Sequence, residues 1–248
     1  MPARLHELQK PLIYSGTYDA DAFDAAIDYI VSHYFRDPSY FLVEGSPYFS
    51  IYELKNLIDR MGGIEIASSA FRRFQEKTRA AGFRDLHLNA VAWGLEGIPD
   101  MRSLLHSLGV RSVTLYTWIH HYALHGFPAT EYQEAMESAP AYWSKAREMF
   151  GVPYHTDVSM GWDPSPRTCQ SDMFERGEYP FTRVLINNTP ELFQKALMQA
   201  KSHIDLLGDK PKILTINAWN EWTERSYLEP DSDHGMSYLN AVRNVFRS

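Results

Sequence analysis

The chain lacks the features that would place it in an oxidising compartment or a membrane. It has one cysteine, Cys169, in 248 residues, so no disulfide can form within it, which is compatible with a reducing compartment. No apolar run approaches the roughly 20 residues that cross a bilayer as a helix. The first residues, MPARLHELQKPLIYSG, have neither the apolar core nor the cleavage site of a secretory signal. If Met1 is the natural start, these absences predict a cytoplasmic protein without a membrane span.

Excess positive charge, repeats and low-complexity segments are also missing. The net charge of −7 argues against nucleic acid as a partner. What remains is an ordinary globular composition, with 44% hydrophobic, 22% charged and 14% aromatic residues. The length suits a single α/β domain over residues 1–248. Abundant aromatic side chains fit either a sugar-binding cleft or a well-packed core.

Strand and helix signals alternate along the chain. Five β-rich runs are each followed by polar or aromatic residues and then by a helical pattern, and they centre on Tyr48, Leu86, Ser112, Tyr154 and Ile213. This alternation is typical of a parallel α/β protein. A complete (β/α)8 barrel needs eight such units.

Local chemistry predicts where several helices begin. Asp19 or Asp21 is the expected cap of the first helix, and Thr189-Pro190-Glu191 is a strong start for a later one. Thr130 with Gln133 resembles a capping box that opens a helix over residues 130–150, which Pro140 is expected to kink or split. The last helix is expected to begin at Ser232 or His234.

An acidic and aromatic segment follows the last predicted strand. Residues 213–216 form a short apolar run, and Trp219, Glu221, Trp222 and Glu224 come directly after it. Indole rings stack on the C–H faces of sugars, and paired carboxyl groups can divide acid and base roles at a glycosidic carbon. Two glutamates at this spacing also occur on many solvated helices. Their position after a buried strand makes catalysis an equal alternative to a solvated helix face, because functional groups gather at strand ends in barrel folds.

The same segment resembles a family signature. Residues 220–224, NEWTE, with residues 226–231, SYLEPD, are similar to a motif of glycoside hydrolase family 99-like proteins and the overlapping WbsX-like glycosyltransferases. The resemblance extends along most of the chain, through residues 33–35, 38–40, 45–52, 86–91, 116–121, 160–163 and 165–167.

This resemblance implies a TIM-type (β/α)8 barrel that is partial here, because the family's first strands would lie upstream of Met1. It also implies that Glu224 is the general acid/base and that Glu221 acts on the substrate's own 2-hydroxyl group, through an epoxide-like sugar intermediate and with retained configuration. One departure is Arg225, where the family usually has glycine. An arginine that points into the site would lower the pKa of Glu224 and weaken it as an acid, whereas one that points to solvent would change nothing.

Other polar and aromatic residues after predicted strands are candidate sugar contacts. Each can equally be a core or turn residue. They are Trp219, Asn220, Trp222, Glu229, Trp118, His120, Trp162, Asp163 and Asn89. No cofactor is expected, and no metal is expected either, because adjacent His120 and His121 on a strand would point in opposite directions. In a loop, the two could bind a metal together with His125.

Three functions remain open. The first is a retaining glycoside hydrolase that acts on an oligo- or polysaccharide of the α-mannoside type. The second is a glycosyltransferase in the assembly of a surface polysaccharide such as O-antigen. The third is a carbohydrate-binding remnant without activity. In each case, the unpaired strand edges of an incomplete barrel predict self-association.

Overall fold

The computed structural model describes residues 19–208 and 211–247. Within them the chain forms two compact units. The first unit comprises residues 19–115 and 145–155, and the second comprises residues 116–144, 156–208 and 211–247.

Local chemistry correctly predicts the start of one helix and the end of another in the first unit. Asp19 caps α1 (Ala20–Tyr29), and its carboxylate accepts a hydrogen bond of 2.8 Å from the N–H of Ala22. Gly62, with a φ of 97°, ends α2 in the left-handed conformation that glycine adopts without steric cost. The other elements are a π-helical turn η2 (Ile30–Tyr34), α2 (Leu54–Met61), α3 (Ile64–Ala80) and α4 (Met101–Ser107).

The sheet of the first unit is mainly parallel. A tight turn joins β1 (Leu42–Val43) to β2 (Ser46–Ile51), and β2, β3 (His87–Val91) and β4 (Val110–Thr114) then pair in parallel. The first residues of β6, Tyr154 and His155, pair with β4. These strands confirm four of the five predicted strand positions.

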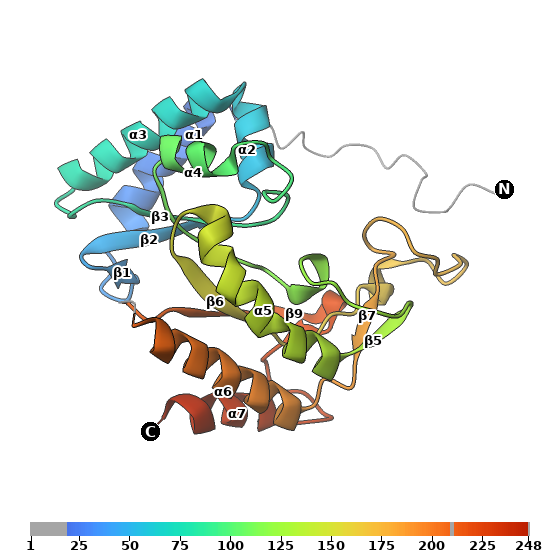
Figure 1. The fold of residues 1–248 in the computed structure, drawn as a ribbon. Coiled ribbons are helices and arrows are strands. Elements are labelled where there is room, and N and C mark those ends of the chain that lie inside the picture. Colours follow the sequence, from blue (N-terminus) through green and yellow to red (C-terminus); the bar gives the residue numbers. More distant parts are fainter. Residues whose placement is uncertain (1–18, 209–210, 248) are drawn as a thin grey trace. The chain divides into compact units, whose positions relative to one another are not determined.

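Phenylalanine rings fill the space between the helices and this sheet. Phe71 and Phe74 on α3 are fully buried, and α1 lies alongside α3 (Figure 1). Phe23 of α1 packs 5.5 Å from Phe71 between ring centroids, and Phe35 stacks 5.8 Å from Phe74. Burying each such ring stabilises the fold by about 1.5–3 kcal/mol.

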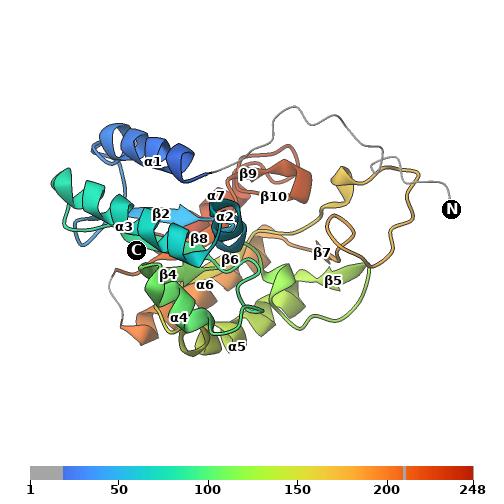
Figure 2. The same ribbon diagram turned by 90° about the horizontal axis from the view of Figure 1, so that it is seen from above.

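The second unit has two pairs of parallel strands. Residues 156–159 of β6 (Tyr154–Ser159) pair with β8 (Leu214–Asn217), the fifth predicted strand. The short strands β5 (Ala129–Glu131) and β7 (Val184–Ile186) pair with each other, as Figure 2 shows. Among the described residues β6 is the only strand that pairs with β8, so the other edge of β8 has no strand partner.

The helices of the second unit correct two predictions. The prediction that a helix opens at Thr130 is wrong, because Thr130 lies in β5 and α5 (Tyr132–Phe150) begins two residues later and continues unsplit through Pro140. The last helix, α7 (Ser237–Phe246), begins after the predicted positions because Asp231 accepts the N–H groups of Asp233 and His234 in a turn. The predicted start of α6 (Pro190–Leu207) is confirmed: Thr189 caps it, and α6 packs beside α7.

Strands followed by helices make this an α/β fold, as the sequence predicts. In the described part of the chain, no helix combines the length and apolar character needed to cross a bilayer.

Candidate active site

Both glutamates of the acidic segment lie on one hairpin that follows β8. The strand ends at Asn217, and β9 (Asn220–Glu221) then pairs antiparallel with β10 (Ser226–Tyr227). Between them residues 222–224 form a 3-10 turn, η5. The hairpin therefore places Glu221 and Glu224 at the carboxyl end of a parallel strand, where barrel enzymes carry their catalytic groups.

The backbone around Glu224 is fixed against the loop after β6. The N–H of Asp163 donates to the carbonyl oxygen of Glu224 at 2.7 Å, and Ser226 Oγ donates to the carbonyl oxygen of Gly161 at 2.5 Å. The approach is close enough that a Cβ on Gly161 would meet Arg225 O at 2.7 Å and Asn188 Nδ2 at 2.6 Å. A side chain at residue 161 would therefore clash with the hairpin, and only glycine fits without a shift of the backbone.

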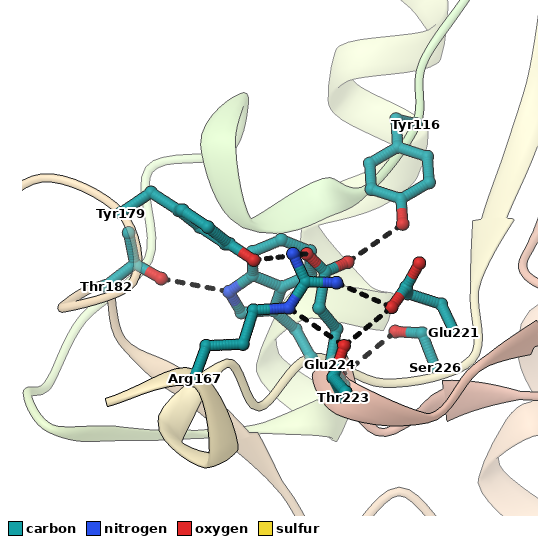
Figure 3. Close-up of polar contacts among 9 residues, drawn as sticks. Tyr116, Arg167, Tyr179, Thr182, Glu221, Thr223, Glu224 and Ser226 are labelled. Carbon is teal, nitrogen blue, oxygen red and sulfur yellow. Dashed lines mark hydrogen bonds and ion pairs between the residues drawn. The ribbon is translucent and has the colours of Figure 1, made fainter. Parts of the chain in front are cut away.

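Glu224 is a buried carboxylate held by two tyrosines. The residue is 5% exposed. Tyr179 donates to its Oε1 and Tyr116 to its Oε2, each at 2.8 Å (Figure 3). Burial, together with the hydrogen bond to Glu224 and its charge, raises the pKa of Tyr179 to about 12. Tyr179 therefore remains a hydrogen-bond donor at neutral pH.

Arg167 links the two glutamates. Its Nη2 donates to Glu221 Oε1 at 2.7 Å, and its Nη1 lies 3.6 Å from Glu224 Oε1 (Figure 3). Its Nε donates to Thr223 Oγ1, which in turn donates to Glu221 Oε1 at 2.8 Å. Although burial opposes it, the pKa of Arg167 is raised by Tyr179 and the two carboxylates. The Glu221 side chain is 35% exposed and that of Glu224 is 7% exposed, so Glu221 is the carboxylate that solvent reaches more readily.

Arg225 points away from this carboxylate pair. Its guanidinium lies 3.7 Å from Asp163 Oδ2, and its side chain is 64% exposed. Its φ of 49° is left-handed, the backbone conformation that glycine adopts without cost. Within the described residues, Arg167 is the cation that contacts Glu224.

Two of the predicted sugar contacts, Trp162 and His120, pack against each other next to a tyrosine that holds Glu224. Trp162 is 2% exposed and donates through Nε1 to Thr182 Oγ1. Its ring lies 5.0 Å from His120 and 6.3 Å from Tyr116, the donor to Glu224. Burial and the neighbouring His121 lower the pKa of His120 to about 4, so its ring is neutral at pH 7.

Trp118 occupies a different environment from the other tryptophans near the site. It is fully buried, and its ring packs 5.5 Å from Tyr132 and 5.9 Å from Tyr122. Its indole Nε1 donates to the carbonyl oxygen of Asp157. The indole nitrogen and the ring faces of Trp118 thus contact other residues of the second unit, so Trp118 is a core residue.

Exposed aromatic rings also lie on and next to the hairpin, besides Tyr179, which is 41% exposed. Trp219 is 54% exposed and Trp222 is 44% exposed. Trp222 stacks on Tyr227 with centroids 3.7 Å apart, and its Nε1 donates to Glu229 Oε2 at 2.7 Å. Asn220 is exposed on β9. These groups give the hairpin indole faces and polar atoms that a sugar can reach.

Asn89 lies in the first unit, inside β3. It is fully buried; its Oδ1 accepts from Ser50 and its Nδ2 donates to Ser112. By contrast, sequence reasoning did not assign Tyr116, Arg167 or Tyr179 to the site. They are 108, 54 and 45 residues from the glutamates they contact. Tyr116 and Arg167 fall within stretches that carry the family resemblance, but nothing in those stretches links them to the glutamates. No three His, Cys, Asp or Glu side chains in the described part of the chain are grouped to hold a metal ion.

A model of the family described as glycosyltransferase WbsX matches residues 3–242. The chain belongs to this family. It is 26% identical over 229 residues to the protein WxcX of Xanthomonas campestris pv. campestris strain B100, a match that covers 87% of this chain and 29% of WxcX. The chain thus spans under a third of that relative's length.

The fold of this WbsX family member is similar to solved carbohydrate-enzyme structures. The GH99 endo-α-mannosidase of Bacteroides thetaiotaomicron matches with a TM-score of 0.57 at 16% identity, over 94% of this chain and 62% of that one. A glycoside hydrolase-like protein matches with a TM-score of 0.58 at 14% identity, over 92% and 59% of the two chains. At such identities the likeness concerns the fold.

Proposed function

We propose that this chain carries the catalytic residues of a retaining glycoside hydrolase that acts on α-mannoside-like glycans. The observation that carries the proposal is the pair of carboxylates at the end of β8. Glu224 is buried and held by Tyr116 and Tyr179, Glu221 is more exposed, and Arg167 contacts both. The fold shared with an endo-α-mannosidase supports the choice of substrate class.

In the proposed first step, Glu221 takes the proton from the sugar's 2-hydroxyl group. The 2-oxygen attacks C1 as the glycosidic bond breaks, and Glu224 gives a proton to the departing oxygen. In the second step, water opens the three-membered ring at C1, Glu224 takes the water proton, and Glu221 returns a proton to O2. Two displacements at one carbon retain the configuration.

Substitution of Glu224 tests this proposal. Glu224→Gln keeps the shape and loses the titrating group, so release of sugar from an α-mannan oligosaccharide is expected to fall by at least about 100-fold. Glu148→Gln, an exposed glutamate on α5, is the matched control and is expected to retain full turnover. Turnover by Glu224→Gln at the wild-type rate would refute the role of this residue.

A second candidate function is glycosyl transfer, because the family model that matches the chain is described as a glycosyltransferase. In that case, Glu224 would assist transfer to an acceptor sugar instead of water. A glycan incubated with and without nucleotide sugars separates the two: sugar release without a donor supports hydrolysis, and chain extension only with a donor supports transfer.

A third candidate, carbohydrate binding without catalysis, also has an observation in its favour. Tyr116, Tyr179 and Arg167 already contact the Glu224 carboxylate, and a substrate must displace or share these contacts. If wild-type protein binds the oligosaccharide but neither cleaves nor extends it, binding is the function.

We further propose that the two compact units belong to one partial (β/α)8-type domain over residues 1–248. The parallel strands β2, β3, β4, β6 and β8 correspond to its later units. Within the described residues β8 lies at the edge of its sheet, with β6 as its strand neighbour, which supports self-association through the other edge of β8. Sedimentation velocity on the isolated chain tests it, and a monodisperse monomer at all concentrations would contradict it.

A further inference from the structure

A polar pocket lies in the second unit, next to the hairpin but separate from the carboxylate pair. It has a volume of about 260 Å³, and its lining includes Met160, Asn188, Arg225, Tyr227, Asp233 and His234. Neither Glu221 nor Glu224 lines it. Its walls follow the ends of β6, β7 and β10, so it opens among loops of the kind that bind ligands in parallel α/β proteins.

The backbone conformation of Arg225 divides the two sites. Glu224 is buried among the tyrosines, whereas Arg225, the next residue, has a left-handed backbone and lines the pocket. Gly161 leaves room for Asn188, whose Nδ2 donates to Met160 O at 3.2 Å. The wall opposite Arg225 is thereby held in place without a side chain at residue 161.

The loop that presents Asp233 and His234 is also fixed. Asp231 Oδ1 accepts from the N–H of Asp233 at 2.9 Å and from that of His234 at 2.5 Å. Tyr238 of α7 supports the same wall, because its ring meets His234 edge-on at 5.3 Å and its hydroxyl donates to Asn188 O. The side chains of Asp233 and His234 themselves are exposed, so they can reach a ligand.

The chemistry of the lining fits a neutral, polyhydroxylated ring. Arg225 and Asn188 supply donors, Asp233 supplies a carboxylate acceptor, and Tyr227 adds an aromatic ring. The positive charge of Arg225 is matched by Asp233 and by Asp163 at 3.7 Å, so the pocket offers no net positive field for an anion. A pocket of this size accommodates one sugar residue.

We propose that this pocket binds one uncharged hexose unit of the glycan, at a subsite distinct from the bond-cleaving carboxylates. The proposal rests on the proposed function in one respect, that the ligand of this chain is a glycan. It assigns to the side chain of Arg225, which lines the pocket, a contact with this sugar.

The test is titration of the chain with methyl α-D-mannopyranoside, followed through the side-chain NMR signal of His234. A saturable shift of that signal is expected in the wild type and in Glu224→Gln, because Glu224 does not line the pocket. Asp233→Ala and Arg225→Ala are each expected to weaken this binding about ten-fold, the loss of roughly one charged hydrogen bond. Thermal melts of the variants verify that they fold.

Three results would overturn the proposal: no shift of the His234 signal, a shift that Glu224→Gln abolishes, or a shift with inorganic phosphate and not with the sugar. The test is separable from the proposed function. If the sugar shifts the His234 signal but the chain cleaves no glycan, the subsite is supported and the proposed hydrolase function is refuted. If the chain cleaves glycans but the His234 signal does not shift, the hydrolase function is supported and the subsite is refuted.

Discussion

Two polar regions of this protein differ in where they stand along their strands. The first region lies inside the strands of the first unit and consists of Tyr48, His87, Asn89 and Ser112. Its side chains form hydrogen bonds with one another or with neighbouring strands: His87 Nε2 and Asn89 Nδ2 lie 2.8 and 2.9 Å from Ser112 Oγ. Burial, with the nearby Arg111, lowers the pKa of His87 to about 4. This region is uncharged at neutral pH.

The hairpin of the second unit carries formal charges after a strand has ended. Glu221 and Glu224 each contact Arg167, and the Glu221 and Arg167 side chains are 35% and 38% exposed. Polar side chains within the strands of the first unit form hydrogen bonds with one another and stabilise the sheet. The charged side chains beyond the end of β8 are partly exposed, so a ligand can contact them. Four experiments test this difference.

The largest effect is expected from Gly161→Ala, beneath the hairpin. The new methyl group would meet Asn188 Nδ2 at 2.6 Å and Arg225 O at 2.7 Å, so the backbone around Glu224 must move. The free energy of unfolding in urea is expected to fall by about 2–3 kcal/mol, with loss of turnover. Gly97→Ala is the control, because no atom lies within 4 Å of its added Cβ. Equal stability of both variants would show that the hairpin is not held at Gly161.

Asn89→Ala and Asn220→Ala compare one asparagine from each region. Removing the buried Asn89 amide leaves Ser50 and Ser112 without its hydrogen bonds, and is expected to cost about 2 kcal/mol of stability. Removing the exposed Asn220 side chain is expected to weaken oligosaccharide binding and leave urea unfolding nearly unchanged. An Asn89→Ala variant that is as stable as the wild type but fails to bind the glycan would contradict the structural role of Asn89.

Tyr116→Phe and Tyr179→Phe each remove one hydrogen bond to Glu224. Each is expected to lower turnover roughly ten-fold, the equivalent of about 1.4 kcal/mol, while Tyr34→Phe, an exposed tyrosine of the first unit, has no effect. Because the pKa of Tyr179 is about 12 in the fold, against about 10 for an unperturbed tyrosine, the unfolded chain loses this proton first. Stability is therefore expected to fall as pH rises from about 10 toward 12, and Tyr179→Phe removes that part of the decline.

The smallest effect concerns the backbone of Arg225. Arg225→Gly relieves the left-handed conformation at φ 49°, whereas Arg225→Ala keeps it and removes the same exposed side chain. After glycine's own entropic cost, the glycine variant is expected to be more stable than the alanine variant by about 0.5–1 kcal/mol in thermal melts. Identical melting curves would mean that this backbone carries no strain.

The sequence predicts what adjacent residues decide. Asp19, Thr189 and Gly62 mark helix ends through their own caps and backbone, and the five parallel strands follow from apolar runs. Thr130 misleads because its place is decided by pairing of β5 with β7, where its partner is Leu185, 55 residues away. Glu221 and Glu224 are visible because they share one motif. The tyrosines and Arg167 that hold them come from distant loops, and only the folded chain brings these together.

The most direct test of the carboxylate pair is proton NMR of an α-mannan oligosaccharide during cleavage by the wild-type chain, with Glu224→Gln and Glu221→Gln in parallel. We expect the α-anomer to appear first, before mutarotation, and neither variant to release sugar. First appearance of the β-anomer, or release by either variant at the wild-type rate, would contradict the proposed roles of Glu221 and Glu224.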